Sequence, residues 1–108
     1  VREIILYFLR LKAVPKAGTP AAKAFGGAFV NCWVDRPGLD KAEAAVRKIV
    51  VEQGWEVKEV LTAHAVARTA FEGSSDGVKY YDQAKVDKQV LVFHRWPIGE
   101  TGEAGETP

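Results

Sequence analysis

The sequence predicts an α+β fold, a two-layer sandwich in which a four-stranded, mainly antiparallel sheet carries two helices on one face, as in the ferredoxin-like plan or a variant of it. Three observations predict this class. The chain has 108 residues, which suits one domain. Short segments rich in β-branched and aromatic residues have the two-residue alternation of strands. Two other segments repeat apolar residues at three- and four-residue steps, as helices do.

The first two strands are predicted at residues 2–11 and 27–35. The first, REIILYFLRL, is apolar on both faces. The second, GAFVNCWVD, ends before Pro37 and alternates between two sets of side chains. One set is Val30, Cys32 and Val34, and the other is Phe29, Asn31 and Trp33.

The first helix is predicted at residues 40–53 because apolar side chains recur there at helical spacing: Ala42, Ala45, Val46, Ile49 and Val50. Asp40 and Glu43 fit a capping box at its start. Gly54 suits the left-handed position that follows a helix.

The second half of the chain predicts a strand, a helix and a strand. The strand at residues 55–66 is expected to place Trp55, Val57, Leu61 and Ala63 on one face. A helix of about three turns is expected within residues 70–88, capped by Ser75 or Asp76. The last strand, residues 89–96, has Val90, Val92, His94 and Trp96 on one face, and Pro97 ends it.

The chain is therefore predicted to hold one domain, residues 1–97, followed by a tail. Residues 13–25 have no periodic apolar face and carry basic side chains, so a mobile basic loop is expected there. Residues 98–108 repeat a G-E-x pattern and carry acids without bases, which predicts a disordered acidic tail.

Composition excludes several functions. The formal net charge is +1, which makes a nucleic-acid partner unlikely on charge grounds. The longest apolar run has six residues, too few for a membrane span. Neither a phosphate-binding glycine loop nor enough metal ligands are present, so no cofactor and no metal are expected. The single cysteine, Cys32, and the absence of a signal-peptide pattern favour a reducing cytoplasm.

The second face of the predicted sheet, which carries Phe29 and Trp33, is unusually apolar for a face without helices. A large exposed apolar patch marks an interface or a ligand groove. Two copies of the sheet packed face to face would cover it, so a homodimer is expected.

The same face supplies the candidate ligand-binding residues, whose hydrogen-bonding groups lie among apolar side chains: Tyr7, Asn31, Trp33, His94 and Trp96. His94 and Asn31 are the candidates for a catalytic role. The commoner role of such a histidine is a packed ring bonded to the backbone, and that of the tryptophans is core filling. Cys32 belongs to the opposite set of side chains, where we expect it to pack in the core. A nucleophilic pair of Cys32 with His94 is the alternative that we rank below core packing.

Four short stretches resemble a small bacterial family of uncharacterised proteins: VNCWVD at 30–35, GWEV at 54–57, YYDQA at 80–84 and VLVFHRWP at 90–97. The resemblance covers roughly residues 28–97. It implies a bacterial cytoplasmic setting and adds no chemistry.

Three functions follow from these features. The first is a non-enzymatic homodimeric module that binds a small apolar ligand or a protein through the second face. The alternative is a cofactor-independent enzyme resembling the dimeric α/β-barrel oxygenases and isomerases, in which His94 and Asn31 polarise a carbonyl or move a proton. RNA binding comes last, because no strand carries the basic and aromatic segment of an RNA-recognition sheet.

Overall fold

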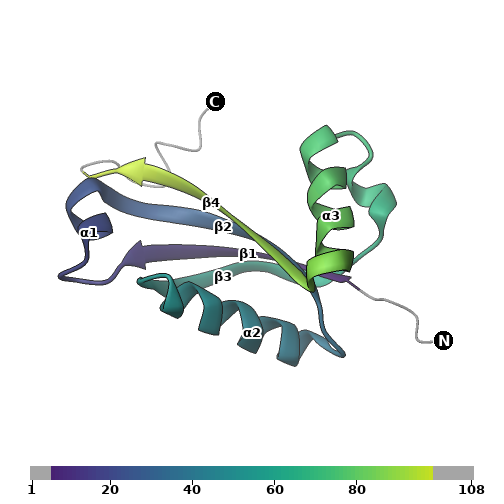
Figure 1. Ribbon diagram of the computed structural model, residues 1–108, viewed down its shortest axis with the longest axis horizontal. Coiled ribbons are helices and arrows are strands. Elements are labelled where there is room, and N and C mark those ends of the chain that lie inside the picture. The colour runs from purple at the N-terminus through teal and green to yellow at the C-terminus, as the bar shows by residue number, and fades with distance from the viewer. Residues whose placement is uncertain (1–5, 99–108) are drawn as a thin grey trace.

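The computed structural model describes residues 6–98. Its elements are β1 (Leu6–Pro15), α1 (Pro20–Ala24), β2 (Phe25–Asp35), α2 (Leu39–Glu52), β3 (Trp55–Val66), the 3-10 helix η1 (Arg68–Phe71), α3 (Ser75–Asp87) and β4 (Gln89–Pro97). The strands form one sheet in the order β3-β1-β2-β4, and each neighbouring pair is antiparallel (Figure 1). The predicted α+β class and four-stranded antiparallel sheet are confirmed.

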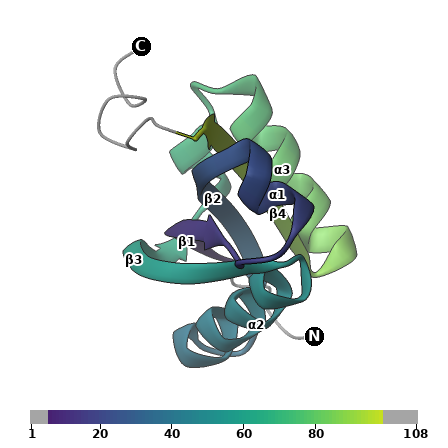
Figure 2. The same cartoon turned by 90° about the vertical axis from the view of Figure 1, so that its left-hand side faces the viewer.

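The two long helices lie on opposite faces of the sheet, whereas both were expected on one face (Figure 2). Helix α2 packs on the first face, which carries Leu9, Val30 and Cys32. Helix α3 packs on the second face, near Leu6 and Trp33. Because β2 is apolar on both faces, each face needs its own cover, and α3 supplies one for the second.

Residues 13–25, predicted as one mobile loop, instead continue the sheet and form a short helix. Ala13 is buried and pairs with Ala28 of β2 and Val57 of β3. Thr19 caps α1 by accepting a hydrogen bond from the backbone N–H of Ala22. Residues 13–15 pair across strands, and a search for periodicity along the chain does not detect such pairing. The predicted acidic tail lies outside the described residues, except for Ile98.

Strand β3 breaks the expected alternation at two points, between the partners of Arg10 and Leu11 and between those of Lys12 and Ala13. At the first of these bulges Leu11 pairs with Val60, so Leu61 is left over. Val60 therefore packs against the first-face core, and Leu61 is 41% exposed. The alternation predicted Leu61 on the face of Trp55, Val57 and Ala63, and the bulge gives that place to Val60 instead.

The helix ends differ from the expected caps by one or two residues. Helix α2 begins at Leu39 after Gly38, and no side chain caps it, so the predicted capping box does not form. Gly54 has φ of +88°, as predicted for the position after a helix. Ser74 caps α3 by accepting from the backbone N–H of Gly77. Within residues 6–98 no helix is long and apolar enough to cross a membrane.

Cys32 lies fully buried in the first-face core, where burial raises the pKa of its thiol to about 12. Because the thiolate is the reactive form, we expect the folded chain to resist a disulfide reagent at pH 8 and to react once urea unfolds it. Thiol release followed by absorbance checks this. Fast labelling without denaturant would place Cys32 outside the core.

Candidate functional site

The second face has a covered half, where α3 and η1 lie on the sheet. Trp33 is 4% exposed and is enclosed by aromatic rings from both sides. Its ring centroid is 5.2 Å from that of Phe8 on β1, 5.6 Å from that of Phe71 on η1 and 5.1 Å from that of Tyr80 on α3. Edge and tilted ring contacts therefore connect the helix layer to the sheet.

Over the other half of the second face, the described residues place no helix. Here the ring of Trp96 lies 5.1 Å from that of Phe29, and the guanidinium of Arg10 lies 4.6 Å above the same phenyl ring. Phe29 is consequently 7% exposed and Trp96 8% exposed. One chain thus covers Phe29 and Trp33, the two side chains for which the sequence alone predicted a partner.

A cavity of about 310 Å³ lies where the two halves meet. Its walls come from three strands, η1 and the start of α3: Phe8, Asn31, Trp33, Phe71, Ser74, Asp76, Gly77, Tyr80 and His94. Four of these are aromatic rings other than the histidine, and the polar groups are few, which is typical of a small-ligand pocket.

Asn31 and His94 form a hydrogen-bonded pair at this cavity. The distance between Asn31 Nδ2 and His94 Nε2 is 3.4 Å. An amide nitrogen only donates, so this bond requires Nε2 to accept, as it does in the imidazole tautomer with its proton on Nδ1. The pair joins neighbouring strands, because Asn31 lies on β2 and His94, an exposed residue, on β4. Chemically, the exposed imidazole can exchange a proton with a bound molecule.

Three of the five predicted binding residues meet at the cavity, namely Asn31, Trp33 and His94. Trp96 lies on the same face but packs against Phe29 and does not line the cavity. Tyr7 lies on the opposite face, against the first-face core, because its neighbour Phe8 takes the second face.

The residues from η1 and α3 were missed by sequence reasoning, because it placed the second helix on the other face. The signal that could have found them is the presence of two aromatic residues, Phe71 and Tyr80, nine residues apart on either side of a turn.

Three buried polar atoms in the described part of the chain have no hydrogen-bond partner, and all lie on the second face: Arg10 Nε, Asn31 Oδ1 and Trp33 Nε1. Arg10 and Asn31 face each other across β1 and β2. Buried polar groups are nearly always paired, so such a cluster calls for an explanation.

An ion pair between Arg68 and Asp82 connects η1 to α3. The guanidinium donates two hydrogen bonds to the carboxylate, at 2.9 and 3.1 Å. This contact holds the pKa of the Asp82 carboxyl below its ordinary value. Because the carboxyl pKa is lower in the folded chain than in the unfolded chain, the contact stabilises the folded chain at pH values above the ordinary carboxyl pKa. This stabilisation is lost as the pH falls through the pKa of the folded chain.

We therefore expect Arg68→Met to raise the pKa of the Asp82 carboxyl toward its ordinary value, and to remove this acid-dependent contribution to stability. A carboxyl ¹³C titration by NMR measures it. Arg47→Met is the matched control, since Arg47 pairs with Glu43 on α2. An unchanged Asp82 titration in Arg68→Met would show that the pair does not form in solution.

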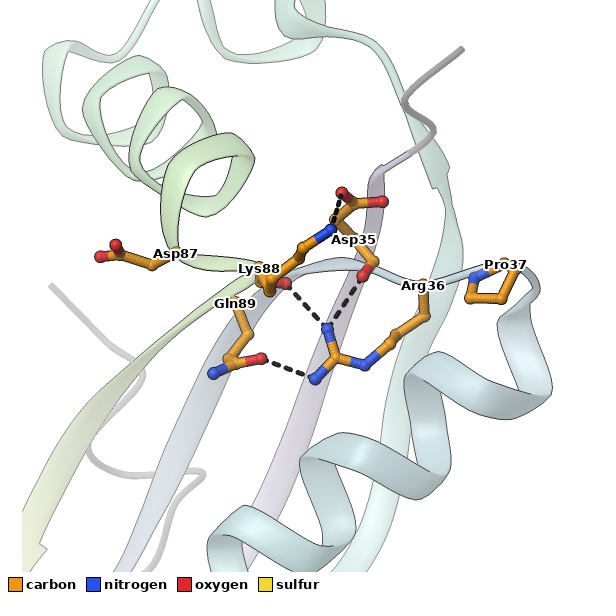
Figure 3. Close-up of a pocket in the computed structure, with 6 residues that line it drawn as sticks. All are labelled: Asp35, Arg36, Pro37, Asp87, Lys88 and Gln89. Carbon is orange, nitrogen blue, oxygen red and sulfur yellow. Dashed lines mark hydrogen bonds and ion pairs between the residues drawn. The ribbon is translucent and has the colours of Figure 1, made fainter. Parts of the chain in front are cut away.

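A second cavity, of about 580 Å³, lies between the ends of β2 and α3 (Figure 3). Arg36 donates to the backbone oxygens of Asp35 and Lys88, at 2.9 and 3.2 Å, and to Gln89 Oε1 at 2.6 Å. The Lys88 ammonium lies 3.7 Å from the buried Asp35 carboxylate. Because these groups bind one another, we interpret this cavity as a structural junction that fixes the start of β4.

Within residues 6–98, no group of three or more His, Cys, Asp and Glu side chains is arranged to hold a metal ion. Comparisons with protein-family models, curated proteins and solved structures find no match. The resemblance to a small bacterial family stays a prediction.

Proposed function

We propose that this chain is a non-enzymatic binding module that holds a small, mainly apolar ligand in the cavity between α3 and the second sheet face. The observation that carries the proposal is the meeting of aromatic walls with the Asn31–His94 pair at one cavity. Its volume of about 310 Å³ lies at the lower end of the range for ligand pockets. A ligand of one or two fused rings suits that volume.

Titration of the ¹⁵N-labelled chain with small aromatic fragments tests the proposal. We expect shifts in the backbone signals of Asn31, Gly77 and His94, which line the cavity, and none at Val46 on α2, which packs on the first face. Fragments that leave the cavity signals unmoved, or that move both faces alike, would count against a pocket.

A pair of histidine variants locates the binding. His94→Gln is expected to weaken fragment binding with little change in melting temperature, because His94 is exposed. His64→Gln is the matched control, since His64 is also exposed and on the second face but does not line the cavity. A large loss of stability in His94→Gln with binding intact would assign His94 a packing role.

The second candidate function is a cofactor-independent enzyme, which the Asn31–His94 hydrogen bond favours. In it His94 moves a proton at a bound carbonyl compound, and Asn31 holds the oxygen. Turnover distinguishes it from the binding module. An enzyme changes the mass or isomeric form of its bound compound, and His94→Gln abolishes that change.

We also propose a homodimer in a reducing cytoplasm, joined through the half of the second face that no helix covers. Support comes from Val14, an apolar side chain of that half that a single chain leaves partly exposed. Light scattering is expected to give twice the chain mass at micromolar concentration and the single mass for Val14→Arg. A monomeric parent chain would refute the dimer and leave the cavity unaffected.

A further inference from the structure

We infer that the cavity selects flat cyclic compounds that carry both an N–H donor and a carbonyl acceptor, such as cyclic amides. This inference rests on the proposed binding function and names its ligand class. It comes from the two cavity-lining residues whose buried polar atoms have no partner, Asn31 and Trp33.

The two atoms have opposite hydrogen-bonding character. Trp33 Nε1 carries a hydrogen and only donates, and Asn31 Oδ1 only accepts. The hydrogen bond from Asn31 Nδ2 to His94 fixes the orientation of the amide, which turns Oδ1 away from the imidazole. A ligand that satisfies both atoms therefore needs an acceptor near Trp33 and a donor near Asn31.

The spacing of the two side chains lets one ligand reach both atoms. Asn31 and Trp33 are two residues apart on β2 and point to the same face, so their side chains leave the strand about 7 Å apart. The N–H and carbonyl groups of a cyclic amide are on adjacent ring atoms, so the two side chains converge on one edge of the ligand. The flat shape follows from the walls, since the aromatic residues Phe8, Phe71 and Tyr80 line the cavity.

The charge of the cavity disfavours an anion. Asp76, in the first turn of α3, lines the cavity and would repel the carboxylate of a bound acid. That carboxylate would also place an acceptor oxygen against Asn31 Oδ1, which is itself an acceptor. Arg10 does not line the cavity and lies over Phe29 instead. A neutral cyclic amide fits these groups better than an aromatic acid does.

Access to the two atoms requires a side chain to move, because both atoms are buried. Phe71 is the one placed to do so. Its ring lies against Trp33 at 5.6 Å, and it belongs to η1, a short segment whose other residues are exposed. A ligand ring that enters here takes the place of the Phe71 ring against Trp33.

Matched bicyclic probes test the ligand class. The first probe, 2-quinolone, has both N–H and carbonyl groups; N-methyl-2-quinolone lacks the donor, and naphthalene and 2-naphthoate lack the amide. Binding is read from the indole N–H signals in ¹⁵N spectra, with the Trp33 signal assigned by Trp33→Phe. We expect 2-quinolone to shift the Trp33 signal, leave those of Trp55 and Trp96 in place and bind about tenfold tighter than its N-methyl form.

An Asn31→Leu variant removes the acceptor, and Thr62→Val is its control on the same face outside the cavity. The tenfold preference should disappear in Asn31→Leu and persist in Thr62→Val. Equal binding of all four probes at the cavity, or tightest binding of 2-naphthoate, would overturn the ligand class and leave the binding function standing. If no probe moves any cavity signal, the binding function itself fails.

Discussion

Replacing Trp33 with alanine is expected to lower the free energy of unfolding by about 3–5 kcal/mol, the range for a large aromatic side chain deleted from a core. Trp33 is 4% exposed, and its ring contacts Phe8, Phe71 and Tyr80. These contacts hold η1 and α3 on the second face. Urea unfolding monitored by circular dichroism measures the loss.

Two further measurements make this result specific. Leu61→Ala is the surface control and should cost under about 1 kcal/mol, because Leu61 is 41% exposed beside a bulge. Amide exchange in Trp33→Ala should quicken in α3 before α2, because only α3 rests on that ring. Equal protection of both helices, or a loss as small as that of Leu61→Ala, would show that α3 does not dock there.

Replacing Gly27 with alanine is expected to destabilise the chain by about 1–3 kcal/mol through overpacking. A β-carbon at this position would lie 2.3 Å from Cζ2 of Trp96 and 3.0 Å from the backbone oxygen of Ala13. The indole lies directly on the glycine, so the ring must leave its place against Phe29. Both the unfolding midpoint and the tryptophan emission should change.

Gly73→Ala is the matched control, because a β-carbon there meets no atom within 4 Å. It should leave stability unchanged or raise it slightly by restricting the unfolded chain. In a Trp96→Leu background the cost of Gly27→Ala should fall, since a smaller side chain can yield. A full cost in that background would assign the strain to the backbone of β1 and not to the indole.

Much of the fold was predictable because strand alternation is a local property. The two faces of β2 and β4 follow from the period of two, which correctly separated Cys32 from Asn31 and His94 from Phe93. The side of the sheet taken by α3 was not predictable, because it depends on the whole topology. The bulge at Leu61 was also hidden, because an extra residue shows only when the partner strand is known.

The candidate site was predictable only in its sheet-borne part. Asn31, Trp33 and His94 share a face on neighbouring strands, and their register brings them to one cavity. Phe71 and Tyr80 reach that cavity only through the placement of α3, which local patterns do not determine. That Trp33 Nε1 has no hydrogen-bond partner could not be predicted from the sequence either, because it depends on atomic positions.

Native mass spectrometry of the freshly purified chain tests the binding function most directly. We expect the native mass per chain to exceed the polypeptide mass by that of one small organic compound, which denaturation releases and which Asn31→Leu fails to retain. A native mass per chain equal to that of the polypeptide alone, in the parent chain and the variant alike, would contradict a ligand in the cavity of Asn31, Trp33 and His94.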